Sequence, residues 1–186
     1  MANIYFYEAG NMLAPNKWSS NITSELGDTR IKVSDNTYPN NYVEFFGTFD
    51  YKTNGDLASG IVTSYDYGDI GGSIYSLNGI NVNALTVKKY VVSGNLLGLD
   101  KFILSGNDNI YGSDQDDVLC GWNGDDTING NGGNDICWGG KGNDTFITGK
   151  TRNNQLDMGG DTLYGEVGID TFHAYGGENS VADLGK

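Results

Sequence analysis

Residues 1–102 alternate short runs of β-prone apolar residues with clusters of turn residues. This alternation predicts a small antiparallel sheet. We expect its strands at 3–8, 29–33, 42–51, 59–67, 73–77 and 85–92. Turns are expected at Asn54-Gly55, Gly71-Gly72 and Asn78-Gly79, and one helix at 16–26, where Ser, Asn and Thr weaken the helical pattern. We interpret this region as an N-terminal β cap.

From Ile103 onward, apolar residues recur with a period of nine. Five consecutive units follow, at 103–111, 112–120, 121–129, 130–138 and 139–147. Their eighth positions are Ile110, Leu119, Ile128, Cys137 and Phe146. Repetition at a fixed short period is the signature of a repeat fold. A disordered linker has no reason to keep an apolar residue at every eighth position, so the units predict a folded, all-β segment.

Two other positions of the unit are nearly constant. The sixth positions are Asp108, Asp117, Asp126, Asp135 and Asp144, and the fourth positions are Gly106, Gln115, Gly124, Gly133 and Gly142. A polar insert at 148–155 reads as a loop, after which looser units follow at 156–164, 165–173 and 174–182. These units carry Asp161, Asp170 and Asn179 in sixth place and Leu163, Phe172 and Val181 in eighth place. The expected domains are therefore 1–102 and 103–186.

The amino-acid composition and net charge indicate which kinds of molecule the chain is expected to bind. The chain has 29 Gly against 2 Pro, and 24 acidic against 11 basic residues give a net charge of −13. This charge excludes nucleic acid and anionic membranes as expected partners and favours cations. A merely solvated acidic surface is the alternative, but the regular spacing of the aspartates favours a binding role.

The glycine and aspartate positions have a physical explanation. Glycines at fixed places allow the positive φ angles and close backbone packing that stacked tight turns require. One aspartate per turn places carboxylates in rows whose repulsion opposes folding until a divalent cation lies between them. Carboxylates and turn carbonyls are oxygen ligands, which select Ca²⁺ over zinc or copper. We therefore expect several Ca²⁺ ions.

The units from about 103 to 182 resemble the RTX, or haemolysin-type, calcium-binding repeat G-G-x-G-x-D-x-U-x, where U is a large apolar residue. The resemblance implies a parallel β-roll in which two units make one coil. Turns on the same side are then 18 residues apart, which pairs Asp108 with Asp126, Asp126 with Asp144, and Asp117 with Asp135. Asp161 and Asp170 are expected to form a second cluster with the turns that flank them. Asp126 is expected to serve two sites and Asp135 fewer, while Asn179 weakens the last site.

Strand geometry assigns faces to the remaining positions. If the eighth residue points into the roll, the seventh and ninth point out. The outer face of the even units is then apolar and comprises Val118, Cys120, Ile136 and Trp138. We expect the cap or another copy of the chain to cover it. Cys120 is expected outside and Cys137 inside, so a disulfide between them is not expected.

Catalysis and membrane insertion are not expected. His173 is the only histidine and falls at a ninth position facing out, and no hydrolase, metalloprotease or dinucleotide motif is found. There is no apolar stretch of about 18 residues, and residues 1–10 lack the pattern of a cleaved signal peptide.

The favoured hypothesis is an extracellular or cell-surface calcium-binding structural protein. It folds on Ca²⁺ and self-assembles into an oligomer or filament through the open roll end and the apolar even face. The RTX resemblance implies export by type I secretion. The alternative is the calcium-binding module of a larger secreted enzyme, toxin or adhesin. Recognition of a glycan by exposed tyrosines of the cap is a third hypothesis.

Overall fold

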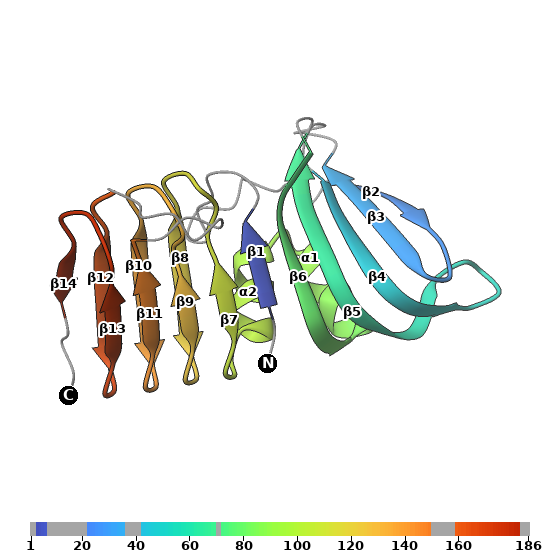
Figure 1. Ribbon diagram of the computed structural model, residues 1–186. Helices are drawn as coiled ribbons and strands as arrows, with labels where there is room; N and C mark the ends of the chain where they lie inside the picture. The colour runs from blue at the N-terminus through green and yellow to red at the C-terminus, as the bar shows by residue number, and fades with distance from the viewer. Residues whose placement is uncertain (1–2, 7–21, 36–41, 70–71, 150–158, 183–186) are drawn as a thin grey trace. The chain divides into compact units, whose positions relative to one another are not determined.

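The computed structural model describes residues 3–6, 22–35, 42–69, 72–149 and 159–182 (Figure 1). The chain divides into two compact units. We call residues 14–103 the antiparallel unit, and residues 1–13 together with 104–186 the roll unit. Over the described residues the fold is mostly β with two short helices, which confirms the all-β prediction.

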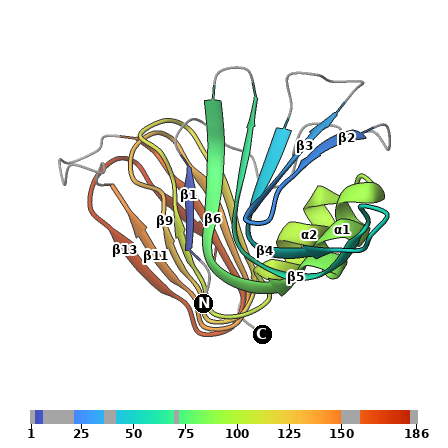
Figure 2. The same ribbon diagram turned by 90° about the vertical axis from the view of Figure 1, so that its right-hand side faces the viewer.

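The antiparallel unit is a meander of five strands followed by two helices. The strands are β2 (Ile22–Leu26), β3 (Arg30–Asp35), β4 (Tyr42–Tyr51), β5 (Leu57–Asp69) and β6 (Gly72–Asn83), each paired antiparallel with the next. The helices are α1 (Ala84–Val92) and α2 (Leu96–Ile103). Figure 2 shows α1 and α2 against one face of this sheet. Neither they nor any other helix in the described part of the chain is long and apolar enough to cross a membrane.

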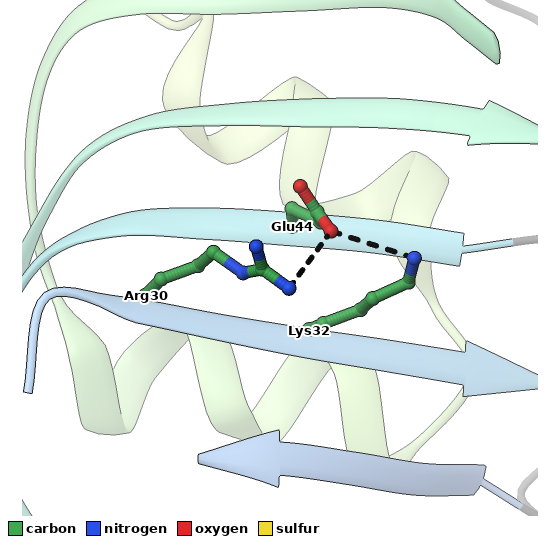
Figure 3. A network of polar contacts seen from close by, with 3 residues as sticks. All are labelled: Arg30, Lys32 and Glu44. Atoms are coloured by element: carbon green, nitrogen blue, oxygen red, sulfur yellow. Dashed lines mark ion pairs between the residues drawn. The ribbon is translucent and has the colours of Figure 1, made fainter. Parts of the chain in front are cut away.

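Strand β3 shows how the period of two builds this sheet. Ile31 and Val33 are buried, whereas Arg30 and Lys32 lie on the opposite face. Both cations approach the same oxygen, Oε1 of Glu44 on β4, at 3.5 Å (Figure 3). The apolar side of the sheet therefore faces the helices, and its other side carries charge.

The strand predicted at 85–92 is wrong, because these residues form α1. The Asn83 side chain accepts hydrogen bonds from the backbone N–H of Leu85 at 2.9 Å and of Thr86 at 3.3 Å, which caps the helix. After the helix, Gly94 has a φ of 68° and donates to the carbonyl of Val91. The β-branched residues of this segment favoured a strand, but the caps at both ends stabilise a helix.

Two other local predictions are corrected. Asn78-Gly79 lies inside β6 at a register irregularity, where Gly79 has a φ of 74°, so it bends a strand instead of joining two. Of the helix expected at 16–26, residues 22–26 form β2 and pair with β3; residues 16–21 lie outside the described residues. The turn at Asn54-Gly55 is confirmed between β4 and β5. Gly71 is outside the described residues, and Gly72 begins β6.

The roll unit consists of two parallel sheets. One contains β1 (Asn3–Phe6), β7 (Asn109–Tyr111), β9 (Thr127–Asn129), β11 (Thr145–Thr148) and β13 (Thr171–Ala174). The other contains β8 (Val118–Asn123), β10 (Ile136–Lys141), β12 (Thr162–Val167) and β14 (Ser180–Ala182). Successive strands of the repeats alternate between the sheets, which is the predicted parallel β-roll.

Strand register shows how the insert is accommodated. Ile110 pairs with Ile128 and Leu119 with Cys137, an offset of one 18-residue coil. Phe146 pairs with Phe172, which is 26 residues further along the chain. The chain between these two strands is therefore eight residues longer than one coil, and the repeat resumes in the same register; Thr148, which was expected in the insert, belongs to β11.

The eighth positions form the interior of the roll, as predicted. Ile110, Leu119, Ile128, Cys137, Phe146 and Leu163 are all 0% exposed. Each large apolar side chain buried in this way contributes about 1.5–3 kcal/mol. In the final coils Phe172 is only half-buried, although its ring stacks on that of Phe146 with centroids 4.9 Å apart.

The N-terminal strand departs from the predicted division at residue 102. Strand β1 pairs in parallel with β7, with Ile4 opposite Ile110, and so belongs to the roll unit. An unpaired β7 edge would present free N–H and C=O groups, which β1 satisfies. A segment distant in sequence thus closes this edge of the first coil.

The outer face of the even units is only partly as expected. Ile136 is 37% exposed, and Trp138 stacks on Tyr164 with ring centroids 5.4 Å apart. Cys120 is in register with Trp138 at the ninth position that was predicted to face outward, and it is 5% exposed. Both cysteines are free, as predicted.

Candidate metal centre

The six-residue turns arrange the sixth-position aspartates in two files. The first file is Asp108, Asp126, Asp144 and Asp170; the second is Asp117, Asp135, Asp161 and then Asn179. In each file, the backbone N–H of one residue donates to Oδ1 of the residue one coil later, at 2.8–3.0 Å. All the aspartates except Asp170 are nearly inaccessible to solvent, at 3% exposure or less.

The files correct and complete the predicted pairing. The three pairs expected at a spacing of 18 are adjacent in the structure. Asp161 and Asp170 do not form a separate cluster: they extend the two files across the insert, next to Asp135 and Asp144. Asp135 therefore has a neighbour on each side, like Asp126, and the expected difference between these two residues has no structural basis.

The second carboxylate oxygen is directed differently from the first. Oδ2 of Asp126, Asp144 and Asp170 is buried and has no hydrogen-bond partner among the described residues. Carboxylate oxygens are strong acceptors, and buried acceptors without a partner are rare in folded proteins. These atoms are thus suited to a cation.

Each Oδ2 lies over the first glycine of its own unit. A Cβ added to Gly121, Gly139 or Gly165 would be 2.1–2.4 Å from Oδ2 of Asp126, Asp144 or Asp170. A side chain at this position would displace the carboxylate, so the first glycine of the repeat forms its cradle.

The fourth-position glycines allow the turns to stack. Gly124, Gly133, Gly142 and Gly168 have φ between 107° and 155°. A Cβ on Gly142 would lie 2.0 Å from the carbonyl oxygen of Gly124 in the preceding coil. Gln115 occupies the equivalent place in the first turn of its file.

We expect Gly142→Ala to destabilise the calcium-loaded protein by about 2 kcal/mol or more, since it adds backbone strain and a clash. Gly106→Ala is the matched control, because nothing lies within 4 Å of its added Cβ; its effect should stay within about 0.5 kcal/mol. Thermal or denaturant unfolding measures both. Equal destabilisation by the two variants would contradict this role of the fourth position.

Sequence reasoning missed a second ladder, formed by the fifth positions. Asp125 and Asn143 donate their backbone N–H to the side-chain Oδ1 of Asn107 and Asp125, at 3.0 and 2.7 Å. On the other side, Asn134 donates to Asp116 at 2.7 Å. These bonds run from the later coil to the earlier one, opposite to those of the aspartate files. Five successive Asn or Asp residues at the fifth position were the signal in the sequence.

The last turn has no carboxylate in sixth place. Asn179 uses Oδ1 to accept from the N–H of Asp161 and donates its Nδ2 to the carbonyl of Gly176 at 2.5 Å. The first position of this unit is Ala174, and the units of Asp108 and Asp161 likewise begin without glycine, at Ile103 and Leu156. What distinguishes the last turn is therefore the loss of one negative charge.

Burial and mutual repulsion disfavour the ionised carboxylates in the metal-free roll. The pKa of Asp126 is raised to about 7 by burial, by Asp144 and by Asp108, against the lowering effect of its hydrogen bond from the Asp108 N–H. Burial and, secondarily, Asp170 and Asp125 raise the pKa of Asp144 to about 6, against a similar backbone hydrogen bond from Asp126. A cation beside these oxygens would reverse both effects.

The stabilising effect of calcium should therefore depend on pH. Because their folded pKa values exceed the unfolded values, these aspartates penalise the metal-free roll above about pH 7, and protonation relieves the penalty as the pH falls toward 4. Protons also compete with Ca²⁺ for the carboxylates. We expect millimolar Ca²⁺ to raise the Tm less at pH 5.5 than at pH 8, measured by calorimetry. An equal rise at both pH values would contradict this.

The candidate metal ligands are oxygen atoms that are spread over successive turns. No group of three or more His, Cys, Asp or Glu side chains converges on a point within the residues that the structure describes. Each turn offers one buried carboxylate at its sixth position, so a bound ion would draw its remaining ligands from turn carbonyls and water. Flexible all-oxygen coordination of this kind fits Ca²⁺ better than Mg²⁺, which requires strict octahedral geometry.

Fold and site together define a class: a parallel β-roll with stacked, aspartate-bearing glycine turns, of the calcium-binding type. The family model described as the RTX calcium-binding nonapeptide repeat (4 copies) matches residues 104–128, 123–146 and 157–182. This region of the chain consists of RTX calcium-binding repeats. Searches of curated proteins and of solved structures returned no match.

Proposed function

We propose that the chain is an extracellular calcium-binding structural protein whose roll unit folds around several Ca²⁺ ions. The ligands are the carboxylates of Asp108, Asp117, Asp126, Asp135, Asp144, Asp161 and Asp170. The observation that supports this is the pair of buried aspartate files, in which Oδ2 of Asp126, Asp144 and Asp170 accepts no hydrogen bond from the described residues. The proposal assigns no catalytic residue.

The charge distribution supports the same function. Fifteen of the 24 acidic residues, but only four of the 11 basic ones, belong to the roll unit. Excess charge of one sign destabilises a compact state through self-repulsion. Divalent cations between the turns offset this repulsion where it is greatest.

The affinity that we assign to the roll follows from its proposed extracellular location. Extracellular calcium modules bind with Kd on the order of 10⁻⁴ to 10⁻³ M, and we assign the roll to this range. At cytosolic calcium the roll stays unfolded, which suits export of an unfolded chain. Type I secretion is the proposed route, because RTX repeats are typical of proteins that use it.

Calorimetric titration tests calcium binding directly. We expect the chain to bind more than one Ca²⁺ ion with Kd between about 10⁻⁴ and 10⁻³ M, and Mg²⁺ to bind much more weakly. Absence of calcium binding at millimolar concentration would refute the proposal.

The terminal coil supports self-association as the structural role. Val181 is 50% exposed at an interior position of the repeat, and Ile169 is 83% exposed in the adjoining turn. Strands β13 and β14 are the last of their sheets, so their edges can pair with further strands. We assign this surface, together with Ile136 and Trp138 on the even face, to contacts with a second copy.

Sedimentation in millimolar Ca²⁺ tests this assignment. The native chain should form concentration-dependent oligomers, and Val181→Asp should reduce them while the bound calcium stays nearly unchanged. The second candidate function, a calcium-binding module of a larger secreted enzyme, toxin or adhesin, rests on the same exposed coil, which further repeats would cover equally well. A strict monomer at high protein concentration would favour that candidate.

A further inference from the structure

The antiparallel unit contains a cavity of about 210 Å³ between α1 and the sheet. Its walls come from the inward faces of β3, β4 and β5 and from one side of α1. The turn between β4 and β5 contributes Gly55 and Asp56 at its mouth. All of these elements belong to the same unit.

The interior of the cavity is apolar. Val33, Phe45 and Val62 from the sheet and Val87 and Val91 from α1 line it, and each is at most 5% exposed. An engineered apolar cavity of about 150 Å³ is large enough to bind benzene. The larger space here accommodates one aromatic ring with a short chain.

Lys88 interrupts the apolar stripe of α1 that faces the cavity. Ala84, Val87 and Val91 follow the i, i+3, i+7 spacing of a buried helix face, and Lys88 lies on the same face at i+4. Lys88 is exposed, so its ammonium group can reach solvent while its alkyl stem lies beside the apolar lining. The neighbouring Lys89 does not line the cavity.

The two charged residues at the mouth, Asp56 and Lys88, differ in their partners. The Asp56 carboxylate accepts a hydrogen bond from Nδ2 of Asn54 at 2.9 Å, and its backbone N–H donates to Oδ1 of Asn54 at 3.2 Å. Lys88 makes no ion pair with any residue in the described part of the chain. Asp56 keeps its negative charge under these hydrogen bonds, so the mouth carries one anion, held by Asn54, and one cation, and Lys88 is the group there that can pair with an anionic ligand.

We propose that this cavity binds a small aromatic monocarboxylate. The ring occupies the space between Phe45 and Val87, and the carboxylate pairs with Nζ of Lys88. An apolar body combined with one anionic group matches both parts of the site, since ligand sites are mostly apolar with few polar groups that fix orientation.

The test is a titration of the calcium-loaded full chain with 3-phenylpropanoate, 3-phenylpropan-1-ol and 3-phenylpropylammonium, followed by amide NMR. We expect shifts at the amides of Ala84, Val87 and Val91. The alcohol should bind about three- to ten-fold more weakly than the carboxylate, because it forms no ion pair, and the ammonium compound more weakly still.

Variants separate the ion pair from the cavity. Lys88→Gln should reduce the affinity for the carboxylate to that for the alcohol, whereas Lys89→Gln, an equal charge change on the same helix, should leave the preference intact. Ala84→Leu fills the cavity and should abolish binding of both compounds, with folding checked by its amide spectrum. If Ala84→Leu does not fold, the two lysine variants still test whether Lys88 pairs with the ligand carboxylate.

Any of three results would overturn the proposal. The first is the absence of binding by any of the three compounds at millimolar concentration. The second is equal affinity for carboxylate, alcohol and ammonium, and the third is an unchanged preference in Lys88→Gln. Calcium binding by the roll is measured separately, so its outcome does not affect this inference.

Discussion

Removal of calcium with EGTA is expected to unfold the roll unit and to abolish most of its contribution to the sheet signal in far-UV circular dichroism. At 2 mM free Ca²⁺ and a Kd of about 10⁻⁴ M, each site contributes about 2 kcal/mol. Three or more such sites approach the whole stability of a typical domain, about 5–15 kcal/mol. The fluorescence of Trp122 and Trp138, both in the repeats, should change in parallel.

The folding transition should be reversible and steep in calcium. Stacked coils fold cooperatively because each coil is stabilised by its neighbours, so added Ca²⁺ should restore the signal over a narrow concentration range. Mg²⁺ at the same concentration is the control and should not restore it. A circular dichroism spectrum and Tm that stay unchanged in excess EGTA would contradict calcium-dependent folding.

Asp126→Ala and Asp135→Ala are expected to have equally large effects. Each residue accepts one buried hydrogen bond and donates its N–H to the next residue of its file. Loss of a buried charged acceptor costs about 1.5–3 kcal/mol, and the loss of calcium ligation adds to it. The calcium concentration at the midpoint of folding should therefore rise strongly in both variants.

Asp125→Ala is the matched control for Asp126→Ala. It removes the same charge from the adjacent residue, but Asp125 is exposed, and water can replace the hydrogen bond it accepts from Asn143. Its effect should remain below about 1 kcal/mol. A midpoint shift as large as that of Asp126→Ala would mean that net charge, not ligation, controls folding.

Asp126→Asn separates structural from ligating roles. The amide oxygen can still accept from the N–H of Asp108, but the buried negative charge is lost. We expect this variant to disfavour the calcium-free fold less than the native chain does, because the ionised carboxylate is unfavourable there, and to respond less to calcium. A calcium titration followed by circular dichroism measures this, and a response as large as that of the native chain would contradict this account.

The repeat could be predicted from the sequence because its information is local. The apolar eighth position, the aspartate at the sixth and the glycine at the fourth recur within nine residues, and each has one structural consequence. Burial of Ile110 and Phe146 follows directly from that pattern. The outer ladder through Asn107 and Asp125 was equally visible in the sequence but was missed.

The antiparallel unit was harder to predict because its signals compete. In 84–92, β-branched residues favour a strand, whereas the spacing of Ala84, Val87 and Val91 favours a helix. Capping by Asn83 and packing on the sheet decide in favour of the helix. At Gly79 the same local signal serves a turn or a bend inside a strand, and only the pairing partner distinguishes them.

The sequence by itself determined the repeat, its interior, the carboxylates offered to calcium and the spacing that aligns them, because a period of nine acts on neighbouring residues. Only the tertiary structure decided that Asp135 meets Asp161 across the insert, that β1 closes the edge of β7, and that α1 and the sheet enclose a cavity beside Lys88. These contacts join residues far apart in the chain, and their energies depend on packing and pairing that no local pattern encodes.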